Sequence, residues 1–198
     1  MTSKINLKAV LSGFFAGFSF RQKVENDPNG DVHVIQMKDL EHNYSTIGVN
    51  LTKISSEIVS SKSFLRKGDV LLITKGANNY AVEYKLDFEK AIAASAFFVL
   101  RPDPRKVIPA YLAWYINQTP VQQHLKANLA GTYIPNLNKG AIEEIVITLP
   151  TIEEQELVVA IDSLRTREFE LTTKLLEKRN VFTATLLMDI VNGKPKTI

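Results

Sequence analysis

The stretch LAGTYIPNLNKGAIEEIVITLPTIEEQELVV, residues 129–159, decides the fold of this chain. Inside it, the apolar and β-branched residues 145–149 predict a short strand that ends at Pro150. Thr151 stands three residues before Glu154, which is the spacing of a capping box. In that motif the threonine side chain accepts a hydrogen bond from a first-turn amide, and the glutamate accepts one from the threonine amide. The stretch therefore predicts the last strand of one segment and the beginning of a helix.

A long helix is expected to follow this joint. Residues 152–192 contain no glycine or proline, and Gly193 and Pro195 are expected to end the helix. At 1.5 Å per residue such a helix is about 60 Å long, more than a small domain needs. Apolar residues at spacings of three, four and seven predict a coiled-coil stripe, which we call the stripe: Leu157, Ile161, Leu164, Leu171, Leu175 and Phe182. Glu168 and Lys178 interrupt this stripe, and we expect it to pack against another long helix.

Before the joint, the chain alternates short β-rich runs with turns. Strands are predicted near residues 32–37, 47–51, 57–60, 70–74, 81–86 and 91–100. Helices are predicted to begin at Pro109 and, after a Thr119 cap, at Pro120. These patterns predict an α/β (α+β) domain with a mixed sheet over residues 1–150. One long coiled-coil helix over residues 151–193 and a tail over residues 194–198 would follow it.

Composition limits the class of protein. The chain has 198 residues and no cysteine, which excludes disulfides and thiolate zinc sites and suits a reducing cytoplasm. We expect no signal peptide, because glycines and serines interrupt the apolar residues 7–20 and no convincing small-x-small cleavage site follows. We expect no membrane partner, because no run reaches the roughly 18 apolar residues of a membrane span. Residues 1–150 carry 17 Lys and Arg against 13 Asp and Glu, whereas residues 151–198 carry 7 against 8. A mildly basic domain permits a nucleic-acid partner without requiring one.

Patterns for catalysis are sparse, and we expect no cofactor and no metal. The three histidines, His33, His42 and His124, lack the spacing of metal ligands. No glycine-rich phosphate loop is present, and residues 27–30, Asp-Pro-Asn-Gly, lack the second proline and the aromatic residue of amino-methyltransferases. One alternative is open: Asp69, Glu83 and Lys85 could hold Mg²⁺ and orient a water for phosphodiester cleavage.

Three polar clusters have the side chains that contact DNA. Amides pair with adenine edges, and cations and aromatic rings bind phosphates and bases. The first cluster is Lys75, Asn78, Asn79 and Tyr80; the second is Thr132, Tyr133, Asn136, Asn138 and Lys139; the third is Arg21 and Lys23. Each cluster is also typical of a solvated loop, and Asn-Asn is common in hairpin turns.

Several of these motifs together resemble one known family. The motifs are Gly131-Thr132 followed by Pro135 and Leu137; Leu149-Pro150 with Glu153 or Glu154 and then Gln155; Gly68-Asp69-Val70-Leu71; and Tyr111-Leu112 with Tyr115-Ile116-Asn117. In this combination the chain resembles the specificity (S) subunit of Type I restriction–modification systems. The family usually has Pro-x-x-Glu-Gln where this chain has one extra glutamate. It also usually has two recognition domains and two long helices in tandem, where this chain has one of each.

The resemblance implies a non-catalytic subunit that recognises double-stranded DNA and carries a helical spacer. The helix would dock methyltransferase subunits and, in a complete system, restriction subunits. Because the chain has one domain and one helix, we expect a homodimer, joined through the stripe, that reads a bipartite inverted repeat. Two alternatives remain: the Mg²⁺-dependent nuclease, and a free-standing DNA-binding dimer without an enzyme partner.

Overall fold

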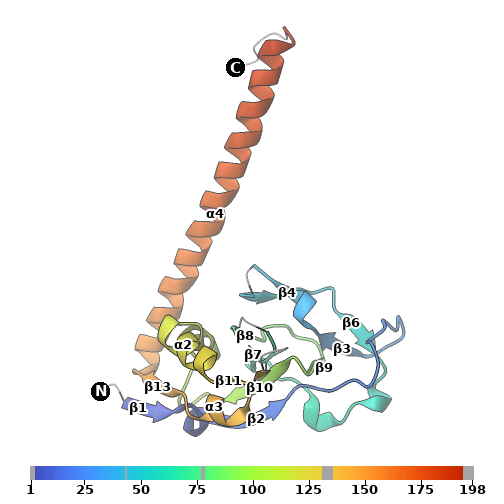
Figure 1. Cartoon of the computed structure of the whole chain (residues 1–198), viewed down its shortest axis with the longest axis vertical. Helices are drawn as coiled ribbons and strands as arrows, with labels where there is room; N and C mark the ends of the chain where they lie inside the picture. Colours follow the sequence, from blue (N-terminus) through green and yellow to red (C-terminus); the bar gives the residue numbers. More distant parts are fainter. Residues whose placement is uncertain (1–2, 43, 77–78, 131–135, 194–198) are drawn as a thin grey trace. The chain divides into compact units, whose positions relative to one another are not determined.

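The computed structural model describes residues 3–42, 44–76, 79–130 and 136–193 (Figure 1). The chain divides into two compact units, Met1–Glu156 and Leu157–Ile198. The strands are β1 (Ser3–Asn6), β2 (Leu11–Ala16), β3 (Val32–Ile35), β4 (Leu40–Glu41), β5 (Thr46–Ile47), β6 (Thr52–Ile54), β7 (Val70–Ile73), β8 (Ala81–Glu83), β9 (Ala91–Ala93), β10 (Phe97–Pro102), β11 (Leu129–Ala130), β12 (Asn136–Leu137) and β13 (Val146–Leu149). The helices are α1 (Pro109–Ile116), α2 (Thr119–Ala127), α3 (Lys139–Glu143) and α4 (Ile152–Val191), with short 3-10 turns η1 (Leu7–Val10), η2 (Met37–Asp39), η3 (Ser56–Ile58) and η4 (Ser61–Ser63).

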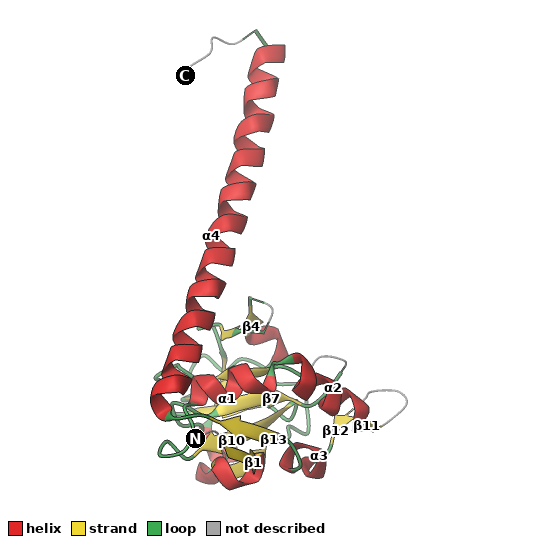
Figure 2. Ribbon diagram, turned by 90° about the vertical axis from the view of Figure 1, so that its left-hand side faces the viewer, coloured by secondary structure: helices red, strands yellow, loops and turns green. Residues whose placement is uncertain are grey.

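Two sheets form the centre of the first unit. An antiparallel sheet has the order β2-β10-β7-β8, and a mixed sheet has the order β6-β3-β9, in which β3 and β9 run parallel. All four residues of β7 are buried, and α1 lies against β7 and β8 (Figure 2). One core includes Leu71, Ile73 and Phe97, and a second gathers around Val32, Val34 and Ile92. The predicted α/β domain with mixed sheet and long C-terminal helix is therefore confirmed.

A buried ion pair holds the beginning of β7 to β10. Asp69 is only 1% exposed, and both its oxygens accept hydrogen bonds of 2.8 Å from the Arg101 guanidinium. Its Oδ2 also accepts the Arg66 amide at 2.8 Å, which closes the turn at Gly68 with a φ of 89°. Arg101 additionally donates to the Phe64 carbonyl. The predicted Lys-Gly-Asp turn is confirmed, and its aspartate serves the fold.

The joint at residues 145–155 forms as its sequence predicts. The β13 strand pairs with β1, and the capping box is present: the Thr151 amide donates to Glu154 and the Glu154 amide donates to the Thr151 hydroxyl. The Tyr111 hydroxyl donates to the Thr148 carbonyl at 2.7 Å. Burial, with Tyr115 nearby, raises the pKa of Tyr111 to about 12, so this hydroxyl remains a donor at neutral pH. These contacts fix β13 against α1.

The α4 helix runs uninterrupted for 40 residues and gives way to a turn at Gly193, whose φ is 67°. Of its 40 residues only Gln155, in the first turn, is buried. The six stripe side chains are each 50% to 71% exposed. No helix in the described part of the chain is both long enough and apolar enough to cross a membrane.

Four local predictions are wrong in detail. The strand expected near residues 47–51 is not there, because β5 ends at Ile47 and β6 begins at Thr52. The strand expected at residues 91–100 is two strands, β9 and β10, with a turn between them. Residues 57–60 were expected to be extended, but the Ser55 hydroxyl accepts the Glu57 amide and favours the η3 turn. Thr119 is not the cap of α2, since Gln118 occupies that position. The predicted tail, residues 194–198, lies outside the described residues.

The ion pair makes a stability prediction. Replacing Asp69 by alanine leaves the Arg101 guanidinium, only 18% exposed, without its carboxylate. We expect a loss of about 3–5 kcal/mol in the free energy of unfolding, measured by urea denaturation. The control is Glu143→Gln, because Glu143 makes only surface pairs with Lys8 and Lys139 and should change stability by less than about 1 kcal/mol. Equal effects of the two substitutions would contradict the assigned role of the pair.

Candidate nucleic-acid interface

Two of the three predicted clusters meet in space. Lys75, two residues after the end of β7, pairs with Asn136 of β12 in an isolated antiparallel bridge. The neighbouring Leu137 amide donates to the Thr74 carbonyl at 2.9 Å. Both Lys75 and Asn136 are exposed. A cation and an amide from distant parts of the chain therefore lie side by side, just beyond the end of β7 and at the beginning of β12.

A third segment joins them through the turn between β9 and β10. The Thr74 amide and hydroxyl both donate to the Ala96 carbonyl, at 2.8 and 3.0 Å. The Lys75 ammonium lies 3.5 Å from the Ser95 hydroxyl. Ser95 was missed in the sequence, where its only signal is a small polar residue between two apolar runs. Its hydroxyl adds a donor and acceptor beside Lys75.

Lys139 and Asn138 have different surroundings within the second cluster. The Lys139 ammonium lies 4.8 Å from the centre of the Phe14 ring and 3.7 Å from Glu143, and its side chain is 53% exposed. Asn138 instead accepts the Ala141 amide at 2.8 Å and caps α3. Lys139 thus remains a candidate phosphate ligand, whereas the Asn138 side chain is used at the helix start.

The other end of the first cluster is partly structural. Asn79 is 0% exposed, and its side-chain amide donates to the Ile73 carbonyl at 3.0 Å. A side chain without exposed surface cannot reach a base edge in this conformation, so we leave Asn79 out of the interface. The sequence alone did not distinguish Asn79 from an exposed loop asparagine. Its partner is the carbonyl of Ile73, the last residue of β7, and the sequence does not reveal that contact.

Tyr80 brings a further segment to this surface. It is half-buried, and its ring stacks on Tyr44 with centres 5.7 Å apart and planes 26° apart. Tyr44 lies in the turn between β4 and β5 with a φ of 67°, in the left-handed region that residues other than glycine rarely adopt. Exposed His42 belongs to the same turn, with a φ of 49°. Neither residue was predicted, since the sequence gives no sign that this hairpin lies beside Tyr80.

The remaining predicted residues are placed elsewhere or lie outside the described residues. Arg21 and Lys23 are exposed on the segment between β2 and β3, whose Phe18, Phe20 and Val24 pack against the second core. Asn78, Thr132 and Tyr133 lie outside the described residues. The set that the structure brings together is therefore Lys75, Ser95 and Asn136, which we call the basic edge. Tyr44 and Tyr80 form a separate stacked pair, and Lys139 lies over the Phe14 ring.

The nuclease alternative finds no support in the geometry. The Asp69 oxygens are bonded to Arg101 and to the Arg66 amide, so this carboxylate is already paired with a cation of the chain. The carboxylate of Glu83 lies 3.4 Å from the Lys85 ammonium. Within the described ranges, no group of acidic residues and histidines could hold a metal ion. The two acidic residues of the motif are thus engaged by cations of the chain itself.

Comparison with known proteins agrees with a DNA-recognition module. The family model described as "Type I restriction modification DNA specificity domain" matches residues 7–178. The chain therefore belongs to the family of Type I restriction–modification DNA specificity domains. Subunits of this family are the non-catalytic, DNA-recognising part of restriction–modification complexes. No curated protein matches the chain.

Solved structures share the fold at low sequence identity. An S subunit from M. genitalium is similar with a TM-score of 0.58 and 14% identity, over 96% of this chain and 45% of that one. The HsdS subunit from Thermoanaerobacter tengcongensis gives 0.65 and 19%, over 96% and 48%. A chain from a study of complex assembly and conformational transition of the type I R-M system gives 0.63 and 17%, over 96% and 43%. This chain thus spans about half the length of each.

The basic edge makes a binding prediction. Lys75→Ala should weaken binding to all DNA sequences alike and reduce the slope of log affinity against log salt by about 1, because one phosphate contact is lost. Asn136→Ala should instead cost about 1–3 kcal/mol of discrimination between target and non-target DNA. Fluorescence anisotropy titrations at several salt concentrations measure both quantities. Lys174→Ala, an exposed lysine of α4, is the matched control, and equal losses in all three variants would exclude the basic edge.

Proposed function

We propose that this chain forms a homodimer in which each copy reads one half of a bipartite DNA target. The homodimer directs DNA adenine methyltransferase subunits to that target. The observation that carries the proposal is the convergence of Lys75, Ser95 and Asn136 from three separate segments of a specificity-family domain. A cation for phosphate and an amide able to pair with both N6 and N7 of adenine are the components of sequence readout. Since its ligand is genomic DNA, we expect the protein to act in the cytoplasm.

The pairing of two copies is supported by the exposed stripe on α4. Its six members lie on one face of the helix, because their spacings keep them within about 80° at 100° per residue. An exposed apolar stripe of this length, though Glu168 and Lys178 interrupt it, is characteristic of an interaction surface. Two copies packed antiparallel would cover both stripes, and the two-fold symmetry would make the target an inverted repeat. The homodimer would then supply two recognition domains, the number usual in the family.

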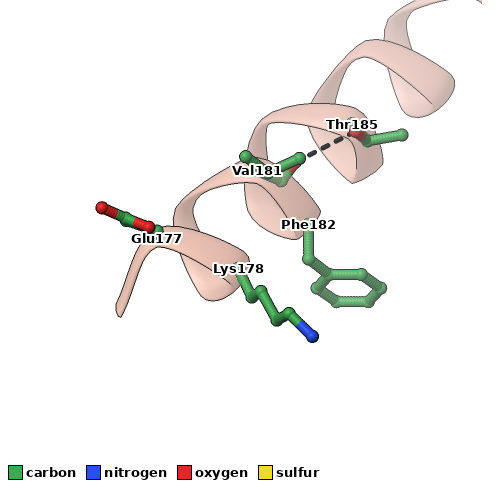
Figure 3. Close-up of a pocket in the computed structure, with 5 residues that line it drawn as sticks. All are labelled: Glu177, Lys178, Val181, Phe182 and Thr185. Atoms are coloured by element: carbon green, nitrogen blue, oxygen red, sulfur yellow. Dashed lines mark hydrogen bonds between the residues drawn. The ribbon is translucent and has the colours of Figure 1, made fainter. Parts of the chain in front are cut away.

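A hollow on the surface of α4 near Phe182 supports the pairing of two helices. A shallow hollow is lined by Glu177, Lys178, Val181, Phe182 and Thr185, all of α4 (Figure 3). Phe182 and Lys178 project to the same side of the helix, and the Phe182 side chain is 68% exposed. The Thr185 hydroxyl donates back to the Val181 carbonyl at 3.0 Å and offers no contact across the hollow. A second helix packed against α4 would cover the open side of this hollow.

A second apolar face on α4 supports methyltransferase docking. Phe169, Leu176 and Leu187 are 58% to 67% exposed and lie about 120° around the helix from the stripe. A helix paired with its copy through the stripe would still present these three side chains. We therefore propose that methyltransferase subunits, and restriction subunits in a complete system, bind this second face. This face is what favours an enzyme partner over a free-standing dimer.

The stripe makes the first prediction of this proposal. The native protein should sediment as a dimer at micromolar concentration, and Leu171→Glu with Leu175→Glu should weaken the dimer by a factor on the order of a hundred or more. The reason is that unpaired carboxylates would be buried in the seam. The control is Thr173→Glu with Asn180→Glu, two exposed positions on the opposite face of the same helix, which should remain dimeric. A native monomer, or a dimer unaffected by charges in the stripe, would refute the pairing.

The second face makes an independent prediction. Phe169→Glu with Leu176→Glu should abolish copurification with the methyltransferase while the protein remains dimeric. In cells that carry the methyltransferase, this variant should also abolish adenine methylation at the target, measured by single-molecule sequencing. If the native protein neither copurifies with a methyltransferase nor directs methylation, it is a free-standing DNA-binding protein and this part of the proposal fails.

A further inference from the structure

The stripe on α4 is interrupted by two side chains of opposite charge. Glu168 and Lys178 both lie within about 60° of the centre of the stripe, at 100° per residue. Both residues are exposed in the structure. A charge that enters an apolar seam costs free energy unless an opposite charge meets it there. Any second helix that covers the stripe must therefore accommodate both charges.

The helix itself gives these two charges no partner. Lys174, four residues before Lys178, has the same charge, and the other residues three or four positions from Lys178 are apolar. Arg165, three residues before Glu168, is bonded instead to Asp162, with its guanidinium 2.9 Å from that carboxylate. In the part of the chain that the structure describes, no ion pair includes Glu168 or Lys178. Both charges are thus open to a second chain.

The two charges are placed symmetrically about the level of Thr173. Glu168 comes five residues before Thr173 and Lys178 five residues after it, and Leu171 and Leu175 are two residues away on either side. In an antiparallel pair of identical helices, a two-fold axis at this level sets each residue opposite its counterpart across the centre. Glu168 would then meet Lys178 of the second copy, and Leu171 would meet Leu175 of the second copy.

The same symmetry continues for two more layers of the seam. Leu164 and Phe182 lie nine residues on either side of Thr173, and Ile161 and Thr185 lie twelve. Phe182 and Thr185 line the hollow on α4, and the Phe182 ring projects from the helix into solvent (Figure 3). The second copy would place its Leu164 and Ile161 over this hollow. The register that pairs the charges therefore also covers the most exposed ring of the stripe.

Other arrangements leave the charges unpaired or opposed. Sliding one helix by a heptad would set Glu168 opposite Leu171 in one direction, or Lys178 opposite Leu175 in the other. A parallel pair would set each residue opposite itself, so that Glu168 meets Glu168 and Lys178 meets Lys178. Like charges in direct opposition repel. Of these arrangements, only the antiparallel pair centred on Thr173 matches both charges.

We propose that the second copy binds α4 antiparallel in the register centred on Thr173, and that two ion pairs between Glu168 and Lys178 select this register. The inference rests on the proposed function, which supplies the homodimer. Polar residues within an apolar seam add little affinity, but they exclude the arrangements in which they have no partner. The charges thus determine orientation and register, and the apolar layers hold the two helices together.

Crosslinking tests the register directly. The chain has no cysteine, so each thiol introduced reports one position. Glu168→Cys with Lys178→Cys should form a covalent dimer under mild oxidation, seen on a non-reducing gel. Each single variant should remain uncrosslinked, because its two thiols would lie about 15 Å apart along the seam. A parallel pair would give the reverse, with each single variant crosslinking to itself.

Charge exchange gives a second measurement. Glu168→Lys and Lys178→Glu should each raise the dissociation constant of the dimer about tenfold or more, because every dimer gains two like-charge contacts. The two changes together should return it to within about threefold of the native value, since each ion pair is remade in reverse. Glu170→Lys is the matched control: it makes the same change of charge on the opposite face, where Glu170 pairs only with Arg167 of its own helix. This control should keep the native value in sedimentation.

The outcomes separate the register from the homodimer. A native dimer overturns the register if a single cysteine variant crosslinks, if the double cysteine variant does not, or if the exchanged charges remain as weak as the single reversals. The proposed function then stands with a different seam. A native protein that sediments as a monomer at micromolar concentration overturns the homodimer itself, and the register with it.

Discussion

The burial of Gln155 is the constraint on which the arrangement of the first unit depends. It is 0% exposed, and its side-chain oxygen accepts the Ile108 amide at 2.9 Å while its nitrogen donates to the carbonyls of Lys106 and Pro150. One side chain thus satisfies the amide just before α1, the end of β13 and the loop between β10 and α1. A buried amide with every group bonded tolerates few alternatives. The first turn of α4 is for this reason part of the domain, and the boundary of the unit falls at Glu156.

The polar side chains of the first unit fall into two groups: some stabilise the fold, and others remain exposed for binding. Asp69, the residue that most resembled a catalytic group, is committed to Arg101 and to the turn before β7. The Asn79 side chain donates to the Ile73 carbonyl, and the Asn138 side chain caps α3. Lys75 and Asn136 remain exposed, and the bridge between them and the Leu137 amide bond to Thr74 hold their backbones together. Exposed donors on a fixed framework are what sequence readout requires.

Sequence reasoning succeeded where the deciding contacts are local. The capping box at Thr151 and the helix end at Gly193 each depend on residues within a few positions, and both are confirmed. It failed where a distant partner decides. The run at residues 91–100, which reads as one strand, is divided because β9 pairs with β3 whereas β10 pairs with β2 and β7 in the other sheet. The bridge between Lys75 and Asn136 joins residues about sixty positions apart, so the two clusters could be found singly but not as one surface.

The central claim is that two copies of one domain read two halves of one target. Selection from a random double-stranded DNA library with the purified protein, followed by sequencing of the bound molecules, tests it most directly. The account predicts enrichment of two identical half-sites in inverted orientation, separated by a spacer of constant length, because a two-fold dimer holds its domains in one relation to the DNA. Enrichment of a single half-site, of two unlike half-sites, or of no sequence at all would contradict it.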